Sequence, residues 1–188
     1  MKGSIGERDK LGFPTLGKRP VVLVDYDPLW PAVFRSLEER VRARLGALAA
    51  AVEHVGSTAV PGLCAKPVID MDVAVREPAD LATAIVRLAD LGYRHLGEMG
   101  IQGREAFREP AGPPRHNLYV CVHGNREWNR HLAFRNHLRH RPDAARAYAD
   151  LKRRLAAAFS DDVDAYCEAK TDFIVSILAA SDLAREDL

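Results

Sequence analysis

The segment VIDMDVAV, residues 68–75, constrains the fold more than any other part of the chain. It is an apolar run interrupted by Asp70 and Asp72, and its composition predicts a strand over Val68–Val75. Side chains two positions apart in a strand lie on the same face of a sheet, so the two carboxylates are expected to project together. The apolar residues between them then face the opposite side, namely Ile69, Met71 and Val73.

Two carboxylates held in this way form half of a site for a divalent metal ion. Hard cations such as Mg²⁺ bind carboxylate oxygens, keep several waters and complete their coordination with substrate phosphates, as in metal-dependent phosphoryl transfer. The alternative is that Asp70 and Asp72 lie on an exposed strand face and are merely solvated. The apolar surroundings favour a functional pair, because a stray charge there is costly.

A Gly-Ser pair, Gly56 and Ser57, follows another predicted strand at Ala51–Val55. A tight turn at this position presents backbone N–H groups and a hydroxyl that can hold a phosphate. Thr58 adds a second hydroxyl, and Lys66 supplies a cation before the strand that carries the acids. The sequence therefore predicts a phosphate-binding turn beside a metal-binding pair.

The rest of the chain predicts helices around a small sheet. Asp27 and Pro28 mark the beginning of a helix over about 28–48, and Val21–Val24 is expected as a strand or an extended lead-in. Periodicity and turn residues predict a helix at Pro78–Leu91, strands at Tyr93–Leu96, Glu105–Arg108 and Asn117–Val122, and helices at about 127–139, 143–159 and 162–180. This order indicates an α/β (α+β) fold, with a mixed sheet packed by helices and a C-terminal helical bundle.

Length and composition are those of an ordinary globular protein. The 188 residues, 47% hydrophobic and 28% charged, suit a single domain over residues 20–188 after a flexible polar tail at 1–19. A net charge of +1 gives no reason to expect binding to nucleic acid or membrane. The 3 cysteines have no metal-site or disulfide-framework spacing. With neither a signal-peptide core nor an apolar run of ~18 residues, a cytoplasmic location is expected.

Three cations occupy positions that otherwise belong to apolar helical stripes: Arg135, Lys152 and Lys170. Charged residues are seldom placed on core-facing stripes without a partner. At least two of the three are therefore expected to reach the cleft beside the acids and bind phosphate. The alternative is that they snorkel at the edge of a packing face.

Other polar residues carry weaker signals. Five histidines lie close together in sequence without sharing an obvious face, namely His116, His123, His131, His137 and His140. His54, just before the Gly-Ser pair, is expected either to orient the turn or approach the substrate, or else to bond loop backbone. The loop arginines, Arg104, Arg108 and Arg115, are expected to be solvated or to close over a phosphate. Cys64 has no neighbouring base in the sequence, so a nucleophilic role is not expected.

The stretch VEHVGSTAVPGLCAKPVIDMDVAV, residues 52–75, closely resembles the signature of the GrpB-like family, a branch of the nucleotidyltransferase superfamily that includes DNA polymerase beta. Similar segments are YDPLW at 26–30, HNLYV at 116–120, WNRHLAFRNHLRHRP at 128–142 and YCEAKTDFI at 166–174, so the resemblance covers about residues 20–180. It implies a nucleotidyltransferase-like fold. It also implies that Gly56 and Ser57 meet nucleotide phosphates while Asp70 and Asp72 bind Mg²⁺.

The superfamily pattern includes a third acidic residue on a later strand, and this chain departs from it. The segment HNLYVCV contains His116, Asn117 and Tyr119 but no acid. A third carboxylate would have to come from Glu53, Glu98 or Glu105, or His116 would have to serve as the base instead.

Two functions from different classes remain open. The first is a Mg²⁺-dependent nucleotidyltransferase that binds an NTP and transfers NMP to an unknown acceptor, with Asp70 and Asp72 as catalytic metal ligands. The second is a non-catalytic nucleotide- or cofactor-binding accessory module, similar to domains joined to dephospho-CoA kinase. The missing third acid is the feature of the sequence that separates them.

Overall fold

The computed structural model describes residues 20–179 and is built around a mixed sheet of 5 strands. The strands are β1 (Ala51–Val55), β2 (Ile69–Val75), β3 (Arg94–Gly97), β4 (Arg104–Arg108) and β5 (His116–Val122), in the order β1-β2-β5-β4-β3. Strands β2 and β5 run parallel, and the other neighbouring pairs run antiparallel. Strand β2, which lies between β1 and β5, carries Asp70 and Asp72, so the acids lie on an interior strand of the sheet and not on an edge strand.

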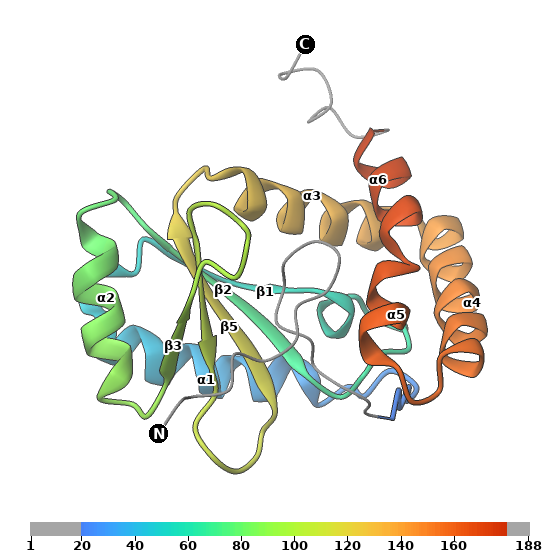
Figure 1. The fold of residues 1–188 in the computed structure, drawn as a ribbon, viewed down its shortest axis with the longest axis horizontal. Coiled ribbons are helices and arrows are strands. Elements are labelled where there is room, and N and C mark those ends of the chain that lie inside the picture. The colour runs from blue at the N-terminus through green and yellow to red at the C-terminus, as the bar shows by residue number, and fades with distance from the viewer. Residues whose placement is uncertain (1–19, 180–188) are drawn as a thin grey trace, which may run out of the picture.

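Helices surround this sheet (Figure 1). They are α1 (Trp30–Leu45), α2 (Asp80–Ala89), α3 (Arg126–His140), α4 (Pro142–Ala158), α5 (Val163–Glu168) and α6 (Thr171–Ala179), with short 3₁₀ helices η1 (Gly46–Leu48) and η2 (Ser57–Ala59). Figure 1 shows α4, α5 and α6 grouped at the end of the molecule away from α2. Within residues 20–179, no helix combines the length and the apolarity that crossing a bilayer requires.

Helix α1 packs against one face of the sheet through residues spaced three or four apart. The Asp27 carboxylate accepts the Leu29 N–H at 2.8 Å in the turn before the helix. The helix begins at Trp30, and Leu29 is its N-cap, without a side-chain cap. The buried stripe of Trp30, Phe34, Leu37, Val41 and Leu45 then joins Met71 and Val73 of β2 in the main core. This burial on one face of β2 directs Asp70 and Asp72 to the other face.

Helix α3 covers part of that other face. Trp128 on α3 packs with Ala74 of β2 and Cys121 of β5 in a separate apolar cluster. The same face of β2 continues toward Asp72 and Asp70, where the contacts become polar. The sheet therefore has one largely apolar face, packed against α1, and one face divided between an apolar patch and the acids.

Most predicted elements are confirmed, including the α/β (α+β) class with its mixed sheet and C-terminal helices. The prediction of one helix over 162–180 is wrong: α5 ends at Glu168 and α6 begins at Thr171. At this break the Lys170 N–H bonds the Cys167 carbonyl instead of continuing the α-helical pattern. Val21–Val24 makes an isolated bridge from Val24 to Ala65 and is an extended lead-in. The predicted tail at 1–19 lies outside the described residues.

Candidate functional site

Asp70 lies beside β5, where its register partner is Asn117. The Nδ2 of Asn117 donates to Oδ1 of Asp70 at 2.7 Å. Burial raises the pKa of the Asp70 carboxyl, and the nearby Asp72 charge adds to the shift, while the Asn117 hydrogen bond and the His131 and Lys66 charges oppose it. The amide thus orients one oxygen of Asp70 without neutralising its charge.

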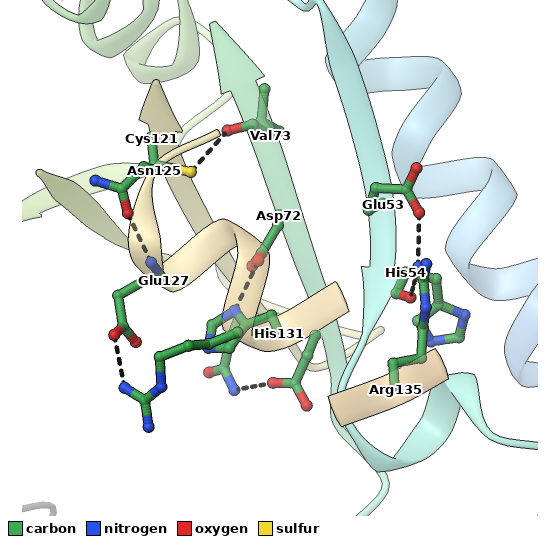
Figure 2. Close-up of polar contacts among 12 residues, drawn as sticks. Glu53, His54, Asp72, Val73, Cys121, Asn125, Glu127, His131 and Arg135 are labelled. Carbon is green, nitrogen blue, oxygen red and sulfur yellow. Dashed lines mark hydrogen bonds and ion pairs between the residues drawn. The ribbon is translucent and has the colours of Figure 1, made fainter. Parts of the chain in front are cut away.

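Asp72 is more deeply buried, with 2% of its surface exposed. Figure 2 shows its carboxylate meeting the imidazole of His131 on α3, where Nδ1 lies 2.7 Å from Oδ2. The other oxygen, Oδ1, is buried and has no hydrogen-bond partner. An orphaned carboxylate oxygen in the interior is costly, so it marks a place where a cation would be stabilising.

His131 is held in a strongly acidic environment. Burial disfavours its charged form, but the hydrogen bond and charge of Asp72, together with the charges of Glu127 and Asp70, raise its pKa above the ordinary value. In the sequence, His131 is one of five closely spaced histidines, and no single role is predicted for it. Its spacing from Trp128 and Arg135 along α3 was the available signal, because residues three and four apart share a helical face.

The Gly56–Ser57 turn lies directly against Asp70. Gly56 has a φ of 68°, and a Cβ at this position would overlap the Asp70 carboxylate. Glycine is therefore required both by the backbone conformation and by the close approach. The prediction that the turn and the acids lie together agrees with this geometry.

The three side chains after Gly56 have different surroundings. Ser57 is half-buried, and its Oγ accepts a hydrogen bond from Nζ of Lys152 at 3.0 Å. Thr58 is 1% exposed, and its hydroxyl bonds Nε2 of His54 at 2.9 Å. Ser57 is thus the hydroxyl of this turn with access to the site, whereas Thr58 supports the turn from inside.

Lys66 and Lys170 converge on one aromatic ring. Their Nζ atoms lie 5.7 Å and 4.1 Å from the centroid of the Tyr166 ring, and both are near Sγ of Cys167. Burial lowers the pKa of Lys170, and the Lys66 charge adds to this shift, while Cys167 and the Asp70 charge oppose it. Two positive side chains therefore lie side by side over Tyr166, and two neighbouring positive charges favour the binding of an anion.

Arg135 contacts strand β1 and not the two lysines. Its guanidinium donates to Oε2 of Glu53 at 2.6 Å and to the His54 carbonyl at 2.8 Å, as Figure 2 shows. The residue is 8% exposed. Its contacts join α3 to β1. Glu53 is the register partner of Asp72 and therefore a candidate third acid, but its carboxylate is held in the ion pair with Arg135.

His54 and His116, for which contact with substrate was one of the alternatives, lie on the opposite face of the sheet, and His54 instead holds the turn through Thr58. His116 alternates with Asn117 along β5, and its ring nitrogens bond the Tyr93 hydroxyl at 2.7 Å and the Pro114 carbonyl at 2.8 Å. His54 stacks on Phe34 of α1 with 4.6 Å between centroids. Strand alternation explains both placements, since each histidine is one position away from the face that carries the acids.

Tyr119 and Arg104 complete the polar face beyond Asp72. Tyr119 is the register partner of Asp72, and the Arg104 guanidinium lies 4.4 Å from the centroid of its ring. Burial and the Asp70 charge raise the pKa of Tyr119 to about 12, so this phenol stays protonated at neutral pH. Nε of Arg104 is buried without a partner.

Asp70 and Asp72 can supply part of the coordination shell of a Mg²⁺ ion. Among residues 20–179, no three or more His, Cys, Asp or Glu side chains gather as a complete metal-binding group. Mg²⁺ is commonly held by one or two carboxylates together with waters and substrate phosphates. Asp70 and the unpaired Oδ1 of Asp72 fit a site of this kind, in which waters and substrate phosphates supply the remaining ligands.

A separate cavity of about 660 Å³ lies between the segment after η2 and the α3–α4 pair. Its lining includes Val60, Leu63, Leu138 and Arg146, and contains neither Asp70 nor Asp72. The acids themselves are enclosed by Gly56, Asn117 and His131.

Comparison with known proteins places the chain in a family. Residues 20–180 match the model of the GrpB protein family. The chain is 35% identical over 162 residues to the UPF0157 protein YqkA of Bacillus subtilis, covering 86% of this chain and 47% of YqkA. It is 31% identical over 182 residues to a dephospho-CoA kinase of Mycolicibacterium paratuberculosis, covering 82% of this chain and 44% of the kinase. The chain thus spans about half the length of each of these relatives.

The fold agrees with this assignment. A crystal structure of the conserved protein GrpB from Enterococcus faecalis superposes with a TM-score of 0.76 and 36% sequence identity, covering 83% of this chain and 94% of that one. The chain belongs to the GrpB family.

Proposed function

We propose that this protein is a Mg²⁺-dependent nucleotidyltransferase that binds an NTP and transfers NMP to an acceptor. The observation that carries the proposal is that Oδ1 of Asp72 is buried without a hydrogen-bond partner. It lies on the same strand as Asp70, and the Gly56–Ser57 turn lies against Asp70. A carboxylate oxygen in this position costs free energy until a cation or donor meets it. A cation would be stabilised at Asp72, and the neighbouring Gly56–Ser57 turn can hold a phosphate. This combination suits a metal–nucleotide substrate.

Asp70 and Asp72 would hold the ion. When bound, Mg²⁺ neutralises phosphate charge and aligns the reacting groups. Asn117 and His131 fix the two carboxylates from β5 and α3. Charged ligands held by hydrogen-bonded neighbours are pre-organised, so little rearrangement is needed on binding.

Lys66 and Lys170 would bind the phosphate chain. Their ammonium groups lie together over Tyr166, and none of the ion pairs found within residues 20–179 involves either lysine. Gly56 allows the backbone of the turn to approach the same region, because a side chain there would collide with Asp70. The site therefore combines two acids for a cation with two amines for an anion.

The second candidate is a non-catalytic nucleotide- or cofactor-binding module. Two observations support it: the β5 neighbour of Asp70 is Asn117 and not an acid, and Glu53 is already paired with Arg135. The similarity to part of a dephospho-CoA kinase is compatible with such a module. A site with fewer acidic ligands would still bind one well-held ion and its nucleotide.

Incubation with labelled NTPs, Mg²⁺ or Mn²⁺ and an acceptor pool from cell extract tests the proposal. Labelled acceptor is expected with the unchanged protein and with Asp161→Asn, which alters an exposed carboxylate. Asp72→Asn is expected to abolish labelling. Binding of NTP without any labelling would favour the module, and the absence of NTP binding would contradict both candidates.

A further inference from the structure

The ammonium group of Lys152 lies inside the protein without an acidic partner. The residue is 2% exposed, and its Nζ donates to Oγ of Ser57 at 3.0 Å and to the Cys64 carbonyl. Nζ also lies 4.8 Å from the centroid of the Tyr148 ring. Within residues 20–179, none of the ion pairs includes Lys152.

This environment favours the neutral amine. Burial lowers the pKa of Lys152 to about 7, the charges of Lys170 and Arg153 act in the same direction, and Cys64 opposes them. Tyr148 stays protonated, because burial raises its pKa. A neutral amine within hydrogen-bond distance of a serine hydroxyl is an arrangement that activates the serine as a nucleophile.

The groups around the amine keep it in position. The Cys64 carbonyl accepts one of its hydrogens, and the Tyr148 ring covers it from one turn earlier on α4. A nucleophile, a base and a group that orients the base are the three parts expected of such a pair. Ser57, Lys152 and the Cys64 carbonyl therefore supply a nucleophile, a base and a group that orients the base.

The surroundings of Ser57 indicate which electrophile it would meet. Gly56, its neighbour, lies against the carboxylate of Asp70. The Lys66 and Lys170 ammonium groups lie over the Tyr166 ring. The Lys66 charge lowers the pKa of Asp70, and the Asp70 charge raises that of Lys170. Acids for a cation and amines for anions suit a phosphoanhydride rather than an uncharged ester.

We propose that Ser57 is the nucleophile of a covalent nucleotidyl-enzyme intermediate and that Lys152 is its base. This step rests on the proposed function. The Ser57 Oγ forms a bond to the α-phosphorus of the NTP, and the bond from that phosphorus to the bridging oxygen breaks. Pyrophosphate leaves with the bonding electron pair, and the hydroxyl proton passes to Nζ of Lys152. An acceptor hydroxyl then bonds to the same phosphorus, and the bond from phosphorus to Ser57 Oγ breaks. Nζ of Lys152 returns its proton to Oγ, and the acceptor proton is released to solvent, so both side chains are restored.

The test uses the full chain with Mg²⁺ and each of ATP, GTP, CTP and UTP, without acceptor. Rapid quenching followed by intact-mass and peptide mass spectrometry is expected to find one nucleotidyl group on Ser57, with one pyrophosphate released per adduct. Labelled pyrophosphate is expected to exchange into the NTP, because the step is reversible in the absence of acceptor. Ser57→Ala abolishes adduct and exchange, whereas Ser160→Ala, which alters an exposed serine, retains both.

The base is tested separately. Lys152→Met is expected to slow adduct formation by about 100-fold or more while NTP binding persists, since general bases contribute factors of this size. In the unchanged protein the rate is expected to rise with pH through about 7, where Lys152 loses its proton. This pH profile remains informative if Lys152→Met fails to fold.

Equilibrium dialysis with α,β-methylene-ATP separates failure of this step from failure of the proposed function. Binding of nucleotide without adduct or exchange with any of the four NTPs overturns the Ser57 intermediate and leaves the proposed function standing. An adduct on another residue, or one that survives in Ser57→Ala, also overturns it. If no nucleotide binds, both fail.

Discussion

The Nδ1 of His131 lies 2.7 Å from Oδ2 of Asp72, and this contact joins helix α3 to strand β2. It occupies one oxygen of a buried carboxylate and leaves the other, Oδ1, without a partner. Asp70, two residues earlier, has one oxygen held in the same way by Asn117. Each acid is thus anchored from a neighbouring element, which makes the pair a rigid half-site.

Gly56→Ala is expected to lower the free energy of unfolding by about 1–3 kcal/mol, because it combines backbone strain with overlap on the Asp70 carboxylate. Urea unfolding measures the change. Gly62→Ala is the matched control, since Gly62 has a φ of 76° but open space around it. An equal loss of unfolding free energy in the two variants would show that overlap with the Asp70 carboxylate adds nothing to the effect of backbone strain.

Lys66→Met and Lys170→Met are each expected to weaken NTP binding by about tenfold, as loss of a charge-assisted contact of ~1.4 kcal/mol would do. The affinity for NMP is expected to change less, because the lysines are assigned to the phosphate chain. Arg154→Met, on an exposed part of α4, is the control. Unchanged NTP affinity in a folded Lys170→Met protein would remove Lys170 from the site.

His54 is expected to make stability depend on pH. Burial, together with the Arg139 and Arg135 charges, lowers its pKa to about 4, whereas the unfolded value is about 6.5. Between these pH values the unfolded chain binds a proton that the folded chain does not, so stability falls as pH decreases through this window. The full effect is on the order of 3 kcal/mol.

Urea unfolding between pH 5 and 7 measures this dependence. His54→Gln is expected to flatten it, while His140→Gln, at an exposed position, leaves it unchanged. A slope that survives in His54→Gln would assign the dependence to another group.

Arg135→Met is expected to lower the free energy of unfolding by about 1–3 kcal/mol, because it leaves the His54 carbonyl and the Glu53 carboxylate without their donor. A double-mutant cycle with Glu53→Gln isolates the ion pair. An unaltered stability together with a large loss of NTP affinity would instead support phosphate binding by Arg135.

The placement of the acids could be predicted from sequence because it depends on local periodicity. Strand alternation directs Asp70 and Asp72 to one face, and the same rule, applied to β5, would have directed His116 away from them and Asn117 toward them. The break at Lys170 was not predictable, because no proline or glycine marks it. The pairing of His131 with Asp72 depends on how α3 crosses the sheet, which is a tertiary property that helical spacing alone does not determine.

The most direct test of the account is Mg²⁺-dependent nucleotide binding by the acids. Isothermal titration with a non-hydrolysable NTP, with and without Mg²⁺, compares the unchanged protein with Asp70→Asn and Asp72→Asn, and with Asp161→Asn as control. Binding is expected to require Mg²⁺ and to weaken at least about tenfold in each of the two site variants. Binding that is indifferent to Mg²⁺ and to both substitutions, or the absence of binding in the unchanged protein, would contradict the account.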